Sequence, residues 1–146
     1  MIHLFLEQIN KKYLEIILDN FGCNYFISNL ALLKYNKTLK FDVSNQDVVK
    51  IKQGYNKIES ISIVLYPIVH IANTDYNIKC TLISLHEIEI GLTLEGIQEL
   101  QYILEYVRDN NEHFHLFGGF NLYTEEEDYS STNLLDSITV YNASNY

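Results

Sequence analysis

The clearest pattern of apolar and polar positions in this chain lies between residues 94 and 109. Apolar residues recur there at intervals of three and four, which places them on one face of an α-helix: Ile97, Leu100, Leu104 and Val107. Thr93 can cap the start of this helix with its hydroxyl, and Asn110 and Asn111 can adopt the left-handed conformation that ends it. The pattern therefore predicts a helix over 94–109 with these four side chains in the core.

The N-terminal part of the chain shows a similar spacing. Apolar residues lie at helical intervals at Ile2, Leu6, Ile9, Tyr13, Ile16 or Ile17, and Phe21, and Gly22 can end such a helix. We therefore predict a helix over 3–20, although residues 13–18 are also rich in the types that favour strands. The pattern over 25–35 fits a helix or a strand equally well.

From Leu39 onward, apolar positions alternate with polar ones, as in half-buried β-strands. Strands are predicted at 39–43, 49–52, 61–65, 68–71, 80–90, 112–117 and 138–141, with a strand break at Pro67 and a hairpin loop over 73–77. No internal repeat is apparent. We predict an α+β fold in one domain of residues 1–146: an antiparallel β-sheet arranged as a meander, with helices packed on one face.

The charge is divided unevenly along the chain. Residues 1–80 contain nine lysines against seven acidic side chains, a net charge of +2, whereas residues 81–146 contain twelve acidic side chains against Arg108, a net charge of −11. A field of this sign disfavours nucleic acid and anionic membranes as partners, and favours a basic protein or a cation. Neither a membrane-spanning apolar run nor a basic secretory leader is visible, so we expect a cytoplasmic protein.

Sequence motifs for common catalytic sites are missing. The chain contains no GxSxG nucleophile elbow, no GxGxxG and no Walker P-loop. Cys23 and Cys80 are far apart in sequence and form no CxxC pair, so we expect two reduced, mostly buried thiols. A disulfide between them is the alternative, and it requires a short distance that the sequence does not give. We therefore predict a protein that is not an enzyme and carries no cofactor.

The outer face of the helix predicted over 94–109 carries acidic and tyrosine side chains at helical spacing. We call it the acidic stripe, and its members are Glu95, Glu99, Tyr102, Tyr106 and Asp109. A solvated face is the simplest interpretation, because polar outer faces are usual for amphipathic helices. The alternative is a protein-binding face, on which carboxylates steer a basic partner and tyrosines supply rigid contact area.

A second acidic segment follows near residue 125 and permits the same two interpretations. A calcium loop is a third, but the alternating Asp-x-Asp-x-Asp-Gly ligand spacing is missing. Four consecutive acidic residues are flanked by tyrosines, in the order Tyr123, Glu125, Glu126, Glu127, Asp128 and Tyr129. Runs of like charge usually face water. As a functional segment, this run would imitate a polyanion, with the two tyrosines as contact anchors.

Three histidines suggest an alternative site. His113 and His115 lie two residues apart on a predicted strand and so point to one face, and His86 lies on the strand predicted before the helix. Neutral imidazoles with carboxylate neighbours suit zinc or iron. No HExxH motif accompanies them, so structural or surface histidines are the favoured interpretation and no metal is predicted.

The segment 88–116 resembles a family of small bacterial immunity proteins, the immunity protein 32 family. The shared order is a strand, a glycine, a helix with spaced leucines, a polar turn and His-x-His-Leu, here at Gly91, Gly96, Leu100, Leu104 and His113-Phe114-His115-Leu116. A closing apolar strand follows at Ile138-Thr-Val-Tyr141. The resemblance implies an intracellular protein that binds and neutralises a cognate toxin of a polymorphic-toxin system, often a nuclease.

Three functions are therefore open. The leading hypothesis is a non-enzymatic immunity protein that covers a basic toxin with its acidic, tyrosine-containing surface. The second is a metal-binding protein or metal-dependent enzyme that uses His86, His113 and His115. The third is a structural or scaffold subunit. The placement of charge in residues 81–146 favours the first.

Overall fold

The computed structural model of the chain describes residues 1–8, 13–43, 53–65, 77–84, 86–117 and 137–146. The elements in these ranges are, in chain order, β1 (Ile2–Glu7), β2 (Tyr13–Leu18), α1 (Asn20–Leu32), β3 (Thr38–Asp42), β4 (Tyr55–Ile58), β5 (Ser60–Leu65), β6 (Ile78–Ser84), β7 (Glu87–Leu92), α3 (Leu94–Asn110), β8 (His113–Phe117), β9 (Ser137–Asn142) and the 3-10 helix η1 (Ala143–Asn145). Neither α1 nor α3 is long and apolar enough to cross a membrane.

The strands form two mixed sheets. One has five strands in the order β4-β1-β2-β9-β8, and the other has four in the order β3-β5-β7-β6. The pairs β2–β9 and β5–β7 are parallel, whereas the other pairs are antiparallel. The α+β class is confirmed, but the antiparallel meander is wrong. Each helix carries the chain from one sheet to the other, so consecutive strands do not all pair with one another.

The two sheets are built from a repeated unit. In chain order, β1, β2, α1, β3 and β5 correspond to β6, β7, α3, β8 and β9. In each half the second hairpin strand pairs in parallel with a strand of the other half, β2 with β9 and β7 with β5. Each sheet thus contains strands from both halves. The sequence shows no apparent repeat, whereas the structure repeats the order of these elements, and the two halves exchange strands.

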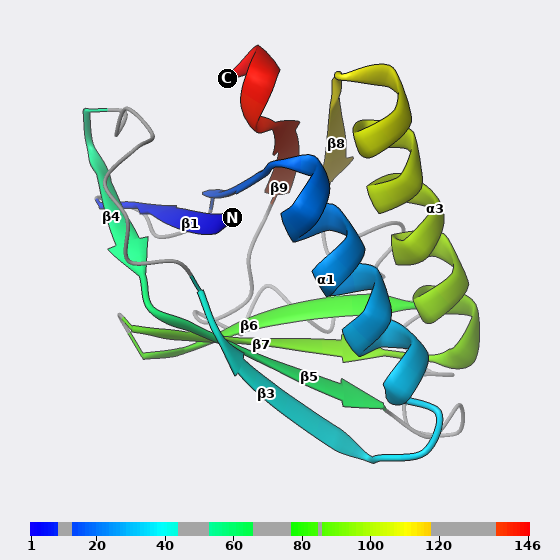
Figure 1. The fold of residues 1–146 in the computed structure, drawn as a ribbon. Coiled ribbons are helices and arrows are strands. Elements are labelled where there is room, and N and C mark those ends of the chain that lie inside the picture. Colours follow the sequence, from blue (N-terminus) through cyan, green and yellow to red (C-terminus); the bar gives the residue numbers. More distant parts are fainter. Residues whose placement is uncertain (9–12, 44–52, 66–76, 85, 118–136) are drawn as a thin grey trace.

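The helices lie side by side and antiparallel on one side of the molecule, with both sheets against them (Figure 1). Counted from the N-caps Asp19 and Thr93, the same positions of both helices are buried: Cys23, Phe26, Leu30 and Leu33 after the first, and Ile97, Leu100, Leu104 and Val107 after the second. All eight belong to one core cluster with apolar side chains of both sheets. The predicted core face of α3 is confirmed.

The ends of α3 also follow the sequence prediction. The hydroxyl of Thr93 accepts a hydrogen bond from the N–H of Gly96 at 3.0 Å. Asn111 ends the helix in the left-handed conformation, with φ at 51°. Both features were expected from local side-chain chemistry alone.

The predicted helix over 3–20 is wrong, because this segment forms the hairpin of β1 and β2. The strand β2 lies in the middle of its sheet, and residues 14–18 are all buried. A strand buried on both faces shows a continuous apolar run with no period of two, and such a run also fits helical intervals. The ambiguous segment over 25–35 belongs largely to α1.

Most other predicted strands agree with the structure. The predictions over 39–43, 61–65, 112–117 and 138–141 correspond to β3, β5, β8 and β9, while the single strand expected over 80–90 is the hairpin of β6 and β7. The predicted strands over 49–52 and 68–71, the break at Pro67 and most of the loop over 73–77 lie outside the described residues.

Both cysteines are buried and neither forms a disulfide, as predicted. Burial raises the pKa of the Cys23 thiol to about 11 and that of Cys80 further still. At neutral pH both side chains are therefore protonated thiols that are poor nucleophiles.

Candidate protein-binding surface

The acidic stripe lies on α3, on the side away from the core. Tyr102 is 61% exposed, and Glu95 and Asp109 are also exposed, whereas Glu99 and Tyr106 are half-buried. The helix therefore brings all five side chains to one outer surface, but they are not equally accessible.

Glu99 is the electrostatically unfavourable member of this surface. It forms no hydrogen bond or ion pair with the described residues, and burial raises the pKa of its carboxyl group. Partial burial disfavours the charged form of a carboxyl group that has no compensating partner. Ionisation of Glu99 therefore adds no stability to the fold, because no described residue interacts with its negative charge.

Tyr106 differs from Tyr102, although the two are neighbours on the stripe. Its ring meets the ring of Phe114 on β8 edge-on, with centroids 5.9 Å apart, and it packs against the core cluster. Much of the Tyr106 side chain therefore stabilises the fold. Tyr102 is the tyrosine of the stripe whose ring is mostly exposed to solvent.

Asp109 is neutralised by its neighbour. Arg108 donates from Nε to Asp109 Oδ1 at 2.8 Å, and this hydrogen bond lowers the pKa of Asp109. The same guanidinium reaches across to α1, where Nη1 donates to Asn24 Oδ1 at 2.8 Å. The uncompensated negative charge of the stripe is therefore concentrated at Glu95 and Glu99.

The equivalent surface of α1 is apolar, a feature that the sequence analysis missed. We call it the aromatic stripe; it consists of Phe21, Tyr25 and Leu32 on α1 and Tyr35 in the turn that follows. Phe21 is 77% exposed and Tyr35 is 84% exposed. These residues occupy the positions that Glu95, Glu99, Tyr106 and Asp109 occupy after the other N-cap. Their helical spacing was the available signal, but the apolar core face of the same segment obscured it.

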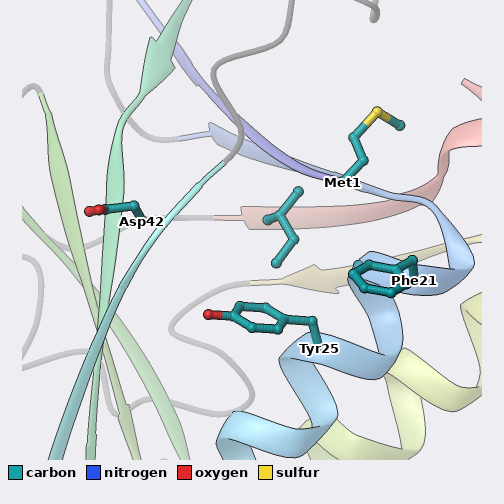
Figure 2. A pocket seen from close by; sticks show the side chains of 6 residues that line it. Met1, Phe21, Tyr25 and Asp42 are labelled. Atoms are coloured by element: carbon teal, nitrogen blue, oxygen red, sulfur yellow. The ribbon is translucent and has the colours of Figure 1, made fainter.

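A small pocket opens at the N-terminal end of the aromatic stripe (Figure 2). It has a volume of about 180 Å³ and is lined by Met1, Ile2, Phe21, Gly22, Tyr25 and Asp42. Tyr25 extends from α1 toward β3, the strand that carries Asp42 (Figure 2). Pockets for small ligands usually exceed ~300 Å³. This pocket is therefore better suited to one inserted side chain than to a cofactor.

Two of the three predicted histidines come together. The rings of His113 and His115 on β8 lie 4.8 Å apart, and Nδ1 of His115 is 3.0 Å from Oγ1 of Thr139. His86 lies beside the other sheet, between β6 and β7, with Nδ1 3.9 Å from Glu59 Oε1. Within the described ranges, no three His, Cys, Asp or Glu side chains are placed to hold a metal ion.

The histidine pair continues into a polar cluster on the same face of the five-stranded sheet. The ring of Tyr141 contacts those of His113 and Tyr146, and Tyr146 Oη donates to Glu15 Oε2 at 3.0 Å. Glu15 is only 4% exposed. Burial and the neighbouring carboxylate raise the pKa of Tyr146. Sequence reasoning missed Glu15 because it assigned residues 13–18 to a helix.

The second predicted contact segment, from Tyr123 to Tyr129 with Glu125, Glu126, Glu127 and Asp128 between them, lies outside the described residues. The geometric case for a binding surface therefore depends on α3 and α1.

No protein-family model matches the chain, and no curated protein matches it. The resemblance to the immunity protein 32 family accordingly depends on the residues quoted for it. These residues lie on the continuous path of β7, α3 and β8, at Gly91, at Gly96, Leu100 and Leu104, and at His113 to Leu116.

Proposed function

We propose that this protein is a non-enzymatic, cytoplasmic immunity protein, which binds and neutralises a cognate basic toxin, such as a nuclease, through the acidic stripe. The main supporting observation is the half-buried carboxyl group of Glu99, which has no counter-charge among the described residues. A lysine or arginine of a partner would supply that charge. Ionisation of Glu99 would then strengthen the complex instead of only opposing the fold.

The neighbours of Glu99 fit the same role. Glu95 adds exposed negative charge one turn earlier, and Tyr102 presents a rigid aromatic ring one turn later. Exposed carboxylates steer a basic partner toward the surface, and an exposed tyrosine provides an anchor of the kind that often dominates binding energy. A nuclease is a suitable partner because its phosphate-binding surface is basic.

The experiment first asks whether a large toxin gene lies directly upstream, and then measures association with the protein that it encodes over a range of salt concentrations. Glu99→Gln is expected to slow association and to reduce its salt dependence, because a charge in the interface is lost. The matched control is Glu105→Gln on the same helix. This side chain lies off the stripe and accepts a hydrogen bond from Gln101. Equal association rates for both variants and the natural protein would exclude the acidic stripe as the interface.

The contact between His113 and His115 favours metal binding as a second candidate. Two imidazoles are half of a tetrahedral zinc set, so further ligands would have to come from elsewhere. Metal analysis separates this candidate from the first, as described in the Discussion.

A further inference from the structure

The strand β3 forms one edge of the four-stranded sheet, because it pairs with β5 and with no other described strand. The N–H of Val43, just after β3, donates to the carbonyl oxygen of Glu59. In an antiparallel pair, residues bonded to the neighbouring strand alternate with residues whose backbone groups point the other way. The backbone N–H and C=O groups of Thr38, Lys40 and Asp42 therefore point to the open edge.

The aromatic stripe of α1 lies beside this edge. The side chain of Tyr25 extends from the helix toward β3 (Figure 2), and its ring meets that of Phe41 edge-on, with centroids 5.7 Å apart. Leu32 follows seven residues later on the same side of the helix, and Tyr35 lies in the turn that leads to β3. Leu32 is 52% exposed. Exposed apolar side chains therefore stand next to main-chain groups that can pair with a further strand.

The pocket described above lies at the end of β3 that carries Asp42. Phe21 and Tyr25 line it from α1, and Ile2 lines it from β1. The carboxylate of Asp42 points away from these side chains (Figure 2). The pocket therefore favours one apolar side chain of a segment that lies along β3.

We propose that the open edge of β3 and the aromatic stripe together bind an extended, acidic segment of a partner protein, which pairs with β3 as an additional strand. In this mode of recognition, main-chain hydrogen bonds supply affinity and pockets for alternate side chains supply specificity. One apolar side chain of the segment enters the pocket, and others on the same face of the segment pack on Tyr25 and Leu32.

The charges around this site favour an acidic segment. Three positive groups near the site already have ion-pair partners: the Met1 ammonium with Asp19, Arg108 with Asp109, and Lys40 with Glu87. Lys34 and Lys37, in the connection from α1 to β3, are exposed and form no ion pair with a residue of the described ranges. Acidic side chains at that end of the segment would face these two lysines.

The lysine on the strand itself adds selectivity. Lysine on an edge strand discourages pairing with unselected chains. Lys40 projects from the outer face of β3, where it reaches Glu87 of β7 at 3.2 Å. An added strand with acidic residues on that face is compatible with Lys40, whereas a basic strand is repelled by it.

This inference does not depend on the proposed immunity function. The acidic stripe lies on α3 and presents carboxylates, whereas the present site lies on α1 and β3 and is flanked by lysines. A basic surface that fits the acidic stripe would not fit this site. Either interaction can therefore fail without the other.

The test measures binding of short peptides with blocked ends to the full-length protein by fluorescence anisotropy. In one peptide valine alternates with glutamate, and in the other valine alternates with lysine. The glutamate peptide is expected to bind about tenfold more tightly than the lysine peptide at low salt, because Lys34 and Lys37 attract it. Failure of the glutamate peptide to bind, or equal binding of both peptides, would overturn the inference.

Two substitutions of Lys40 separate backbone pairing from charge. Lys40→Pro removes an N–H that points to the open edge and leaves the hydrogen bonds to β5 in place. It is expected to weaken binding of the glutamate peptide roughly tenfold. Lys40→Ala, the matched control, keeps the N–H and should weaken binding less. Leu32→Glu on α1 should also weaken binding, and circular dichroism checks the fold of each variant. Undiminished binding by Lys40→Pro and Leu32→Glu would contradict the proposal.

Amide hydrogen exchange of the natural protein supplies a measurement that needs no variant. The N–H groups of Thr38, Lys40 and Asp42 should exchange quickly in the protein alone and slowly with the glutamate peptide bound. The N–H groups of Leu39 and Phe41, which point to β5, should exchange slowly in both states. Slow exchange at Lys40 in the protein alone would show that the edge of β3 is not open, and would overturn the inference.

Discussion

Gly22 and Gly96 occupy equivalent places in the two halves of this fold, at the third position of their helices. A Cβ atom on Gly22 would overlap the carbonyl oxygen of Met1, and one on Gly96 would overlap that of Asn77. Each oxygen belongs to the residue directly before its own hairpin. The first turn of each helix therefore lies against backbone that cannot be repacked by changing a rotamer.

Alanine at either glycine should destabilise the protein. Because the obstacle is backbone, Gly22→Ala and Gly96→Ala are each expected to cost roughly 1–3 kcal/mol or more, as overpacking usually does. Urea unfolding measures the loss, and Gln98→Ala on the exposed side of α3 serves as a control within about 0.5 kcal/mol of the natural protein. A loss below ~0.5 kcal/mol at both glycines would show that the helices do not approach the hairpins this closely.

The shared core predicts a single unfolding transition. Leu30 and Leu104 are equivalent buried residues of α1 and α3, and each truncation to alanine is expected to cost roughly 2–5 kcal/mol. Because each sheet contains strands of both halves, either variant should lower one common midpoint. Fluorescence and circular dichroism melts that separate into two transitions would contradict this coupling.

The raised pKa of Glu99 makes its effect on stability depend on pH. Below the ordinary value of 4.5 the carboxyl group is protonated in both folded and unfolded chains, so the penalty is absent. As pH rises through the higher folded pKa, the unfolded chain releases its proton more readily and stability falls. Glu99→Gln should therefore raise Tm at pH 7 and leave it nearly unchanged at about pH 3.

Asp109 should have the opposite effect on the pH dependence of stability. Arg108 lowers its pKa, so its contribution to stability is present above the ordinary value of 3.8 and is lost as pH falls through the folded pKa. Asp109→Asn should therefore lower Tm at pH 7, by a small amount because the pair is exposed. Thermal melts in which Glu99→Gln and Asp109→Asn shift in the same direction at pH 7 would contradict these assignments.

The two tyrosines of the acidic stripe should respond differently to truncation. Tyr102→Ala is expected to speed dissociation from the toxin, which corresponds to a loss of roughly 1–3 kcal/mol of binding free energy, with little change in Tm. Tyr106→Ala should also reduce the free energy of unfolding, because its ring packs on Phe114. Neutralising Glu125, Glu126, Glu127 and Asp128 together should instead slow association and flatten its salt dependence. Surface-resonance kinetics and thermal melts of the same variants distinguish these effects.

Protein purified without added metal is expected to contain no stoichiometric zinc, iron or manganese. The described residues bring only His113 and His115 together, and the resulting pair lacks further ligands in these ranges. Elemental analysis of the natural protein and of the double variant His113→Ala, His115→Ala provides the measurement. One metal ion per chain that is lost in the double variant would favour the metal-binding function over the inhibitor.

The parts of the fold that the sequence predicts are those with one buried and one polar face. The helix α3 meets this condition, so its core face, its cap at Thr93 and its end at Asn111 could be predicted. The strands β1 and β2 are buried on both faces, and α1 is apolar on its outer side, so neither shows a clear period. The repeat is hidden in the sequence for another reason. Few side chains at equivalent positions of the two halves are identical.

The candidate surface, like the fold, has one part that the sequence predicts and one part that it does not. The acidic stripe could be predicted because charged residues on a helix with a clear core face identify the outer side. Helical spacing places Glu99 on that stripe, but its partial burial depends on tertiary packing that the sequence pattern does not contain. The aromatic stripe has helical spacing too, but the core face of α1 is also apolar, so the sequence does not show which apolar face is the outer one.

The exchange of strands between the halves has a consequence for synthesis. Tyr13 and Leu18 of β2 pair with Ser137 and Asn142, so the parallel edge of this hairpin has no partner until most of the chain has left the ribosome. Long-range parallel pairing is slow to form, and an open strand edge can pair with another chain. The edge of β2 in the nascent chain therefore stays unpaired during most of translation. The yield of folded protein in the cell should depend on chaperones that shield this edge.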